Sequence, residues 1–465
     1  MLNLLFFVYF LTNYNFKMGN TPINREVVEQ NILALDVPDL GCASIREIVQ
    51  LVSNIEEKTG DRYVRMEMGV PGLPPARIGV EAEIEALRNN VASIYPRIDG
   101  IQPLKDEVSR FVKLFMNIDV DPLGCIPTVG SMQGGYAAFL VAGICRKERD
   151  TLLFIDPGFP VQKQQMLVMG QKYESFDVYD FRGDKLREKL ESFLSKGHIH
   201  SIIYSNPNNP AWICLTEAEL QIIGELANQY DVTVMEDLAY FAMDFRTDLS
   251  KPGVPPYQPT VARYTDNYVL LISSSKVFSY AGQRIGAMVI PDALYHREYP
   301  NLEARLNVHT FGGAIVHRAL YSLSSGTSHS AQYALAAMLK AANDGEFDFV
   351  EDVKEYGERA HIMKEIFLKY GFRIVYDKDM DEEIGDGFYF TIAYPGMTGS
   401  ELLHNLLFYG VSAITLGNTG STKEGLRACV SHVGRDQFPD LEKRLGQFHH
   451  DFPVGEKRET SREMI

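Results

Sequence analysis

The sequence of 465 residues lacks the patterns typical of metal, disulfide and dinucleotide sites. Its five cysteines are scattered and odd in number, and none forms a Cys-x-x-Cys pair. Neither a disulfide framework nor a zinc site is therefore indicated, and a reducing compartment is the simpler interpretation. The eleven histidines include no His-Glu-x-x-His, which disfavours a dedicated metal site. The segment Gly130–Gly135 lacks the Gly-x-Gly-x-x-Gly spacing of dinucleotide-binding proteins.

Basic residues and long apolar runs are also scarce. The chain has 45 lysines and arginines against 61 acidic residues, a formal net charge of −16, which argues against nucleic acid or an anionic membrane as the main partner. The apolar run Met1–Leu11 follows no basic residue, precedes no small-x-small cleavage pattern and is short for a membrane span. We interpret residues 1–17 as a disordered extension or a mis-assigned start before Met18, in preference to a signal peptide, and expect a cytoplasmic protein.

Short apolar runs recur along the middle of the chain with helical patterns between them. Thr216-x-x-Glu219 is a capping box and predicts a helix that continues to Gln229. The alternation predicts an α/β domain whose largely parallel or mixed sheet is sandwiched by helices. The predicted strands are Leu152–Ile155, Ser201–Tyr204, Val232–Met235, Val269–Ile272 and Ile285–Ile290.

A second, smaller domain is expected after the α/β domain. Gly387–Ala393 and Gly425–Val430 predict strands of an α+β unit, between long helical patterns. We expect residues 76–325 to form the large domain and residues 326–455 the small domain. Residues 18–75 are expected to contribute to the small domain, and residues 456–465 to form a frayed charged tail.

Polar side chains follow several of the predicted strands. Asn209, Asp237 with Tyr240, and Lys276 come after three of them, and the aromatic Phe159 occupies an equivalent place. Because parallel strands open a ligand crevice at their carboxyl ends, we expect these residues to share one site. A solvated turn at Lys276 is the alternative. The helix start at Gly130-Ser131 could bind an anion through its backbone N–H groups, or could be a plain cap.

One serine-enzyme interpretation is disfavoured. Ser273-x-x-Lys276 matches the S-x-x-K motif of penicillin-binding proteins, and Tyr204-Ser205-Asn206 and Lys58-Thr59-Gly60 provide its companions. The three motifs occur here in the reverse of that family's usual order. Lys58-Thr59-Gly60 also looks like a charged helix end and not a strand, so we set this interpretation aside.

The motifs taken together resemble the class I/II aminotransferases, which are pyridoxal-phosphate enzymes of fold type I. The resemblance extends from about Gly69 to Arg427, and it is specific because several motifs occur in the family's order and spacing. They are Asn206-Pro207-Asn208-Asn209-Pro210, Asp237-x-x-Tyr240, and Ser273-x-Ser275-Lys276 with Arg284 eight residues on.

The resemblance implies a role for each residue around the cofactor ring. Lys276 is expected to hold pyridoxal phosphate as a Schiff base and to move the substrate α-proton, while Asp237 keeps the pyridine nitrogen protonated. Asn209 and Tyr240 would donate hydrogen bonds to the phenolate oxygen, and Phe159 would stack on the ring. Lys276, Asp237 and Tyr240 are thus the expected catalytic residues.

The resemblance also implies how phosphate and substrate are held. The expected phosphate ligands are Ser131, the Met132 amide, Ser273, Ser275 and Arg284. Tyr95 would reach the phosphate of a partner subunit, which implies a homodimer with shared sites. Arg427 would bind the substrate α-carboxylate, the loop at Gly69 would close over it, and Asn209 would also contact the substrate.

The expected function is transfer of the amino group of an L-amino acid to a 2-oxo acid. A carbon–sulfur β-lyase or a decarboxylase on the same scaffold is the first alternative, and a catalytically silent cofactor-binding regulator is the second. The family's usual Asn-Pro-Thr-Gly is replaced by Asn209-Pro210-Ala211-Trp212, which places the only tryptophan near the cofactor and changes the possible turn. Arg97, His309 and Trp212 are candidates for the pocket lining.

Overall fold

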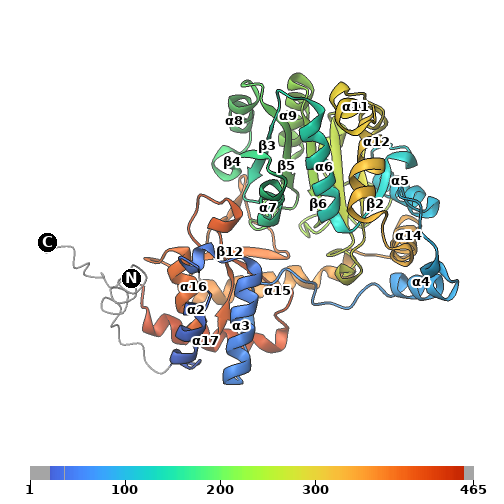
Figure 1. The fold of residues 1–465 in the computed structure, drawn as a ribbon. Helices are drawn as coiled ribbons and strands as arrows, with labels where there is room; N and C mark the ends of the chain where they lie inside the picture. Colours follow the sequence, from blue (N-terminus) through green and yellow to red (C-terminus); the bar gives the residue numbers. More distant parts are fainter. Residues whose placement is uncertain (1–20, 36, 455–465) are drawn as a thin grey trace.

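The computed structural model describes residues 21–35 and 37–454, drawn in colour in Figure 1. The expectations for residues 1–17 and 456–465 therefore lie outside the described residues. Within the described ranges, no helix has the length and apolar character needed to cross a membrane.

A seven-stranded mixed sheet forms the centre of the large domain. Its strands lie in the order β2-β8-β7-β6-β5-β3-β4, and only β8 runs antiparallel to its neighbours. The five predicted strands are confirmed, together with the α/β architecture. The bounds are β2 Cys125–Thr128, β3 Thr151–Asp156, β4 Lys172–Asp177, β5 Ile199–Ser205, β6 Thr233–Leu238, β7 Tyr268–Ser273 and β8 Gly286–Val289.

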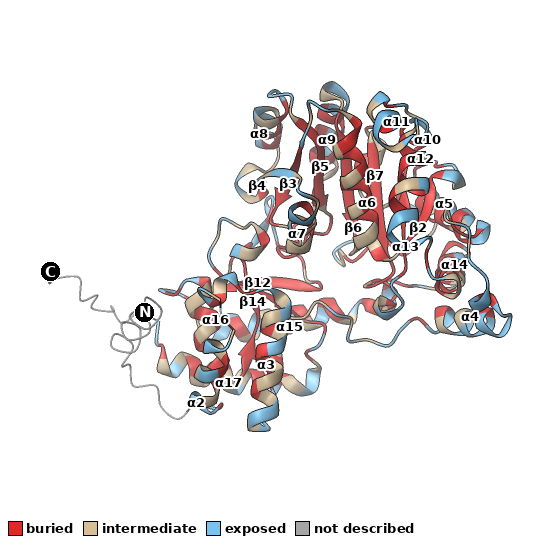
Figure 2. Ribbon diagram, viewed as in Figure 1, coloured by how far each residue is buried: buried red, intermediate tan, exposed pale blue. Residues whose placement is uncertain are grey.

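Both faces of this sheet are covered, and Figure 2 colours its strands as buried except for the edge strand β4, which is partly exposed. Alternate residues of β3 go to opposite sides: Leu153 and Ile155 pack with the helices α5, α8 and α9, whereas Leu152 and Phe154 pack with α6. Burial on both faces explains why the central strands read as continuous apolar runs. The helix bounds are α5 Gln102–Met116, α6 Gly130–Cys145, α7 Pro160–Met169, α8 Lys185–Leu194 and α9 Glu217–Tyr230.

The predicted capping box is present at the start of α9. The Thr216 side chain accepts a hydrogen bond from the Glu219 amide, and the Glu219 carboxylate accepts one from the Thr216 amide. Further helices surround the large domain, and α14 packs along α4 and α5. Their bounds are α4 Arg77–Arg88, α10 Asp292–Tyr295, α11 Pro300–Leu306, α12 Phe311–Ala314, α13 Tyr321–Ser324 and α14 His329–Asn343. The domain limits at residues 75, 325 and 455 stay predictions.

The small domain is built on a four-stranded antiparallel sheet in the order β14-β15-β12-β9. The two strands predicted there are confirmed as β12 and β15. The strand bounds are β9 Arg373–Ile374, β12 Tyr389–Ala393, β14 Ile414–Thr415 and β15 Leu426–Cys429, with a hairpin of β10 Lys378–Asp379 and β11 Glu382–Glu383. Its carboxyl-terminal helices are α15 Glu355–Lys369, α16 Gly399–Phe408 and α17 Phe438–Asp451.

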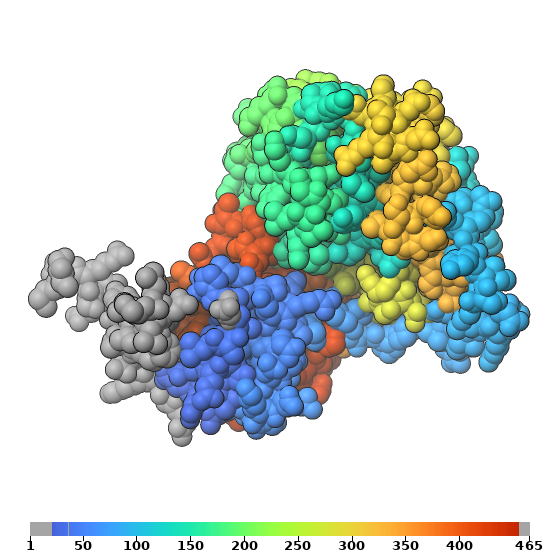
Figure 3. All heavy atoms as spheres, viewed as in Figure 1, coloured from blue at the N-terminus to red at the C-terminus, as the bar shows by residue number. Residues whose placement is uncertain are grey.

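The amino-terminal segment joins this small domain. Its helices α2 (Arg25–Leu33) and α3 (Ile45–Thr59) lie beside α15, α16 and α17 in the lower half of Figure 1. The short strand β1 (Val64–Arg65) pairs in parallel with β13 (Val411–Ser412). In the space-filling view the blue amino-terminal and orange-red carboxyl-terminal segments together form the lower body of the molecule (Figure 3). Residues that follow β1 then enter the space between the two domains.

Candidate active site

The predicted site residues meet where the carboxyl ends of the central strands face the small domain. Asp237 is the penultimate residue of β6, opposite Ser205 of β5 and Leu271 of β7. Lys276 follows three residues after the end of β7. Since the three strands run parallel, their ends bring these side chains to one edge of the sheet, as expected for a doubly wound sheet.

Lys276 lies in a loop fixed by the serines that precede it. The Ser273 hydroxyl accepts a hydrogen bond from the Ser275 amide at 3.1 Å, and the Ser274 hydroxyl donates to the Ile285 carbonyl at 2.7 Å. Burial lowers the pKa of Lys276 to about 8, although Cys429 and Asp237 act in the opposite direction. Among the described residues, no carboxylate lies within 4.0 Å of the Lys276 amine, and the Phe388 ring centre is 5.6 Å away. The amine therefore has no ion-pair partner in the described part of the chain, and Lys276 as a whole residue is partly exposed.

Asp237 is a buried carboxylate held by two hydrogen bonds. Gln162 of α7 donates its amide to Oδ2 at 2.8 Å, and the Ala239 backbone N–H donates to Oδ1 at 3.1 Å. Burial raises the pKa of Asp237 to about 6, and Lys276 acts to lower it. A cation placed against this carboxylate would therefore be held strongly. Sequence reasoning missed Gln162, because its partner lies 75 residues away in the sequence.

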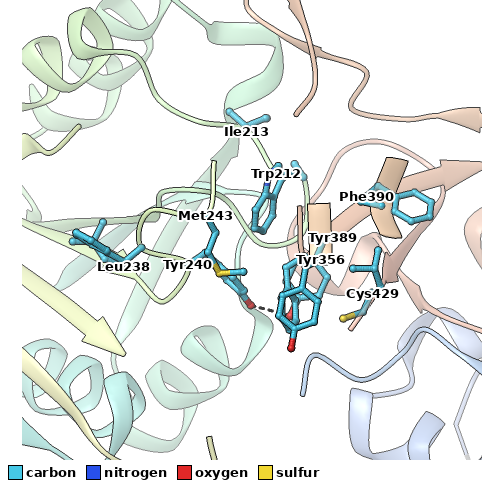
Figure 4. Packing of buried hydrophobic residues seen from close by; sticks show 14 of the residues in the cluster. Trp212, Ile213, Leu238, Tyr240, Met243, Tyr356, Tyr389, Phe390 and Cys429 are labelled. Atoms are coloured by element: carbon cyan, nitrogen blue, oxygen red, sulfur yellow. Dashed lines mark hydrogen bonds between the residues drawn. The ribbon is translucent and has the colours of Figure 1, made fainter. Parts of the chain in front are cut away.

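Tyr240 lies in an aromatic cluster between the domains, shown in Figure 4. Its hydroxyl donates to the Tyr389 hydroxyl of β12 at 2.8 Å, and burial raises the pKa of Tyr240. The Trp212 ring lies 5.5 Å from the Tyr240 ring and is fully buried. Trp212 has a φ of 63°, in the left-handed region that glycine adopts without strain, so a bulky residue here holds a conformation that favours glycine.

Arg427 is a buried cation whose hydrogen-bond partners within the described ranges are all neutral groups. Its Nη2 donates to the Glu67 carbonyl at 2.6 Å, and its Nη1 donates to the Asn209 side-chain oxygen at 3.4 Å. The guanidinium carbon lies 4.7 Å from the centre of the Tyr389 ring. A carboxylate that reached this guanidinium would meet a cation without a competing anion, in the geometry suited to bidentate recognition.

A third group of residues surrounds the amino-terminal end of α6. A Cβ added to Gly130 would lie 2.8 Å from Nη2 of Arg284, and one added to Gly286 would lie 3.3 Å from the Ser131 amide nitrogen. Arg284 therefore lies against the first turn of a 16-residue helix. The Met132 carbonyl in this turn accepts a hydrogen bond from Gln165 of α7 at 3.0 Å. A guanidinium next to a helix amino terminus is a suitable anion site.

The remaining predicted residues lie around this cluster. A Cβ on Gly69 would lie 2.1 Å from the Tyr389 hydroxyl, so this loop packs directly on the aromatic cluster. Phe159 precedes α7 and is partly exposed, and Tyr95 is 89% exposed. Arg97 bonds to Asp99, and His309 lies 3.0 Å from Glu303 on the surface. Their assignment to the pocket stays a prediction, whereas Trp212 lies beside Tyr240.

Two tyrosines and a serine of the small domain were missed by sequence reasoning. Tyr389 contacts Tyr240, Arg427 and the Gly69 loop, as described above. The Tyr356 hydroxyl accepts hydrogen bonds from the Gly72 and Leu73 amides at 3.0 and 3.1 Å, and the Ser431 hydroxyl donates to the Val70 carbonyl. The contacts of Tyr356 and Ser431 join residues more than 280 positions apart, and Tyr389 lies 149 positions from Tyr240. No local pattern in the sequence distinguishes these tyrosines from ordinary core residues.

Several known proteins are similar to this chain in sequence. The family model for aminotransferase class I and II matches residues 67–433. A probable aspartate aminotransferase of Methanocaldococcus jannaschii is 23% identical over 355 residues, which cover 70% of this chain and 85% of that protein. The aspartate aminotransferase of Pyrococcus horikoshii is 25% identical over 252 residues, which cover 54% of this chain and 60% of that protein.

Solved structures of similar fold belong to the same kind of protein. The aspartate aminotransferase from Thermus thermophilus with maleate has a TM-score of 0.71 at 16% identity, covering 91% of this chain and 98% of that one. The alanine aminotransferase from Pyrococcus furiosus has a TM-score of 0.70 at 18% identity, covering 90% and 98%. At these identities the similarity of structure shows a shared fold.

Proposed function

The chain belongs to the class I and II aminotransferases, pyridoxal-phosphate-dependent transaminases of fold type I, and from that premise we propose the roles of its own residues. In this proposal Lys276, Asp237 and Arg427 carry the transfer of an amino group from an L-amino acid to a 2-oxo acid. The observation that carries it is the enclosed Lys276 amine, which has no carboxylate partner among the described residues and lies at the sheet edge with Asp237.

The residues at the site fit pyridoxal phosphate. The cofactor offers an aldehyde, a ring nitrogen that carries a proton and a phosphate, and the site presents a matching group for each. Lys276 is a primary amine, Asp237 is a buried carboxylate, and Arg284 lies against the first turn of α6. When bound, pyridoxal phosphate supplies an electron sink that makes the α-hydrogen of an amino acid acidic.

Lys276 is suited to covalent attachment and to proton transfer. Only the neutral amine can attack an aldehyde or accept a proton, and burial lowers the pKa of Lys276 to about 8. An appreciable fraction of the amine is therefore neutral near physiological pH. In this proposal Lys276 would take up the proton from the substrate Cα and hold it during the transfer.

Asp237 would hold the cofactor, and Arg427 would hold the substrate. Asp237 would hold the protonated ring nitrogen as a buried ion pair, while the hydrogen bond from Gln162 keeps the carboxylate oriented. Arg427 would bind the α-carboxylate bidentately, since its present partners are neutral oxygens. Asn209 contacts Arg427 and would thus contribute to both cofactor and substrate binding. Ser131, Met132, Ser273 and Ser275 would line the phosphate site with Arg284, and Phe159 would cover the ring.

We further propose a homodimer in which Tyr95 reaches the phosphate site of the partner subunit. Tyr95 is 89% exposed, and its neighbour Ile94 is 58% exposed, which supports a surface that is covered in the assembly. A cytoplasmic location is supported by the five free cysteines. Gel filtration with light scattering tests the dimer directly, and a monomer at micromolar concentration would contradict it.

The proposed chemistry is tested by the visible absorption of the protein loaded with pyridoxal phosphate. The native protein is expected to show a band that Lys276→Ala lacks. Addition of single amino acids should bleach this band with accumulation of pyridoxamine phosphate, and the amino acid that does so identifies the substrate. Release of pyruvate and ammonia without pyridoxamine phosphate would instead indicate β-elimination. A native protein without a lysine-dependent band, or one that no amino acid bleaches, would contradict the proposal.

A further inference from the structure

Tyr389 touches three parts of the site at once. Its hydroxyl accepts the hydrogen bond of Tyr240 at 2.8 Å, and its ring lies 4.7 Å from the guanidinium carbon of Arg427. A Cβ on Gly69 would lie 2.1 Å from the same hydroxyl, so the Gly69 loop also packs on it. Figure 4 shows that Tyr240 and Tyr389 come from different domains and point toward one another.

An ordinary core tyrosine of this chain is held differently. Tyr63, which is 2% exposed, donates its hydroxyl to the Leu407 carbonyl at 2.7 Å and so satisfies a backbone group of the small domain. Tyr389 instead uses its hydroxyl on a second tyrosine across the domain boundary, and its ring on a buried cation. Both of these partners belong to the proposed machinery, whereas the Leu407 carbonyl that Tyr63 contacts does not.

We propose that Tyr389 is a positioning residue that links the carboxylate-binding Arg427 to the cofactor-facing Tyr240, an inference that rests on the proposed function. It acts through two separable parts. The ring supports the guanidinium from one side and keeps it available to the substrate carboxylate. The hydroxyl fixes the direction of the Tyr240 hydroxyl.

The role of the hydroxyl follows from how many protons the two phenol groups can donate. Each hydroxyl has one proton to donate and lone pairs to accept with. If Tyr240 donates its proton to the cofactor phenolate oxygen, Tyr389 becomes the donor to the Tyr240 oxygen. A hydrogen bond accepted by Tyr240 makes its own O–H a stronger donor, because bonds in a chain polarise one another. Tyr389 would thereby strengthen the hydrogen bond that Tyr240 offers to the cofactor phenolate oxygen.

The ring part follows from charge. Arg427 is 1% exposed and has no carboxylate within 4.0 Å among the described residues, so the face of an electron-rich ring is its main stabilising neighbour besides two neutral oxygens. Cation–π contacts of desolvated guanidinium groups contribute appreciably to their placement. Phenylalanine at position 389 would keep this contact, and an aliphatic side chain would remove it.

The test compares Tyr389→Phe and Tyr389→Leu in the full-length holoenzyme, with Tyr63→Phe as the matched control. The first measurement is a pH titration of the visible absorption band of the loaded protein, and its midpoint is the pH at which half of the absorption change has occurred. In Tyr389→Phe this midpoint should rise by about 0.2 to 0.5 pH unit, because the deprotonated cofactor loses part of its stabilisation. Tyr63→Phe should leave the midpoint at the native value.

The second measurement is the affinity for two carboxylate probes, succinate and 3-phenylpropanoate. Quenching of Trp212, the only tryptophan of the chain and 6.4 Å from the Tyr389 ring, reports their binding. Tyr389→Leu should bind the probe that the native enzyme prefers roughly 3- to 30-fold more weakly, while Tyr389→Phe should bind it as the native enzyme does. Tyr389→Phe alone tests the hydroxyl part if Tyr389→Leu does not fold.

The outcomes separate this inference from the proposed function. A native protein with a normal lysine-dependent band, whose pH midpoint is unchanged in Tyr389→Phe, would overturn the hydroxyl part alone. Unchanged probe affinity in a folded Tyr389→Leu would overturn the ring part. A native protein without a lysine-dependent band would overturn the proposed function and this inference together.

Discussion

Two lysines of the large domain have enclosed amines, but their surroundings differ. Lys105 of α5 is buried and donates hydrogen bonds to the Asp99 and Leu123 carbonyls at 3.0 and 3.2 Å, and its amine also lies 3.7 Å from the Asp99 carboxylate. Lys276 has no such partner within the described part of the chain. Burial lowers the pKa of both amines, but only the Lys105 amine has a carboxylate within ion-pair distance among the described residues.

Two arginines repeat the same contrast. Arg182 binds both oxygens of Glu219 at 2.7 and 2.8 Å and one oxygen of Asp379 at 2.8 Å, which joins the large domain to the hairpin β10–β11. Arg427 is even more deeply buried, yet among the described residues it bonds only to a carbonyl and an amide oxygen. Lys105 and Arg182 are thus paired with carboxylates of the protein. Lys276 and Arg427 have no carboxylate partner among the described residues and are left for a ligand to neutralise.

This difference has an energetic meaning. A buried ion without a counter-ion costs several kcal/mol, so a protein retains one only where something other than stability requires it. Removing a neutralised cation should therefore destabilise the fold and spare the chemistry. Removing an unneutralised one should abolish the chemistry and spare the fold.

Lys276→Met gives the largest expected effect. Turnover should fall by roughly 10⁴-fold or more, since both the covalent attachment and the proton transfer are lost. The free energy of unfolding of the cofactor-free protein should stay the same or rise by about 1 kcal/mol, because an apolar side chain replaces a buried amine. Steady-state kinetics and chemical denaturation measure the two quantities. Turnover within tenfold of the native value would contradict the role of Lys276.

Arg182→Met should give the largest loss of stability. It leaves the buried Glu219 carboxylate without its cation, while Asp379 keeps Arg246 at 2.7 Å, at an expected cost of about 3–5 kcal/mol in the free energy of unfolding. The exposed Arg435, which pairs with Glu355 and Glu358, provides the matched control, and Arg435→Met should be far milder. An Arg182→Met protein as stable as Arg435→Met would remove the contrast between the two kinds of cation.

Lys105→Met should lower the free energy of unfolding by about 1–3 kcal/mol, since two carbonyls and a carboxylate lose a hydrogen-bonded cation. The loss should be smaller than for Arg182→Met because Asp99 keeps its contact with Arg97, whereas Glu219 would keep no cation among the described residues. Turnover should be retained once the protein is folded. Thermal unfolding and single-substrate kinetics check this, and a loss of turnover comparable to that of Lys276→Met would contradict it.

The pH dependence of stability should show the smallest effect. The ordinary pKa of 10.5 for lysine falls to about 8 at Lys276 in the folded protein. Between these values the unfolded chain holds a proton that the folded chain has released, so the contribution of Lys276 to stability increases as pH rises from 8 to 10.5. Relative to Lys276→Met, the cofactor-free native protein should gain about 1–3 kcal/mol over this window. If the free energies of unfolding of the two proteins changed equally between pH 8 and pH 10.5, the pKa of Lys276 would not be lowered in the folded protein.

Much of the fold followed from local patterns in the sequence. The buried strands β3, β5, β6, β7 and β8 carry uninterrupted apolar runs, and the capping box before α9 is a short-range signal. The edge strand β4 was missed because its sequence, Lys172–Asp177, is mostly polar and partly exposed. That β8 runs antiparallel was also not predicted, because strand direction depends on the path of the loop that contains Lys276.

The residues of the candidate site also fall into those that local sequence predicts and those that it does not. Asp237, Lys276 and Arg427 lie in motifs that local sequence displays, and the structure brings them to one region. Tyr389, Gln162 and Tyr356 were not predicted, since their importance depends on contacts between segments that are far apart in the chain. The role of Tyr95 stays a prediction, because it requires a second copy of the chain.

The most direct test is to locate the lysine that binds pyridoxal phosphate. The loaded protein would be reduced with borohydride and digested, and the modified peptides would be identified by mass spectrometry. Lys276 should carry one equivalent of the cofactor, and Lys105 should remain unmodified although its amine is also buried. Modification of Lys105, or of exposed lysines with none at Lys276, would contradict the claim that the unneutralised amine is the functional one.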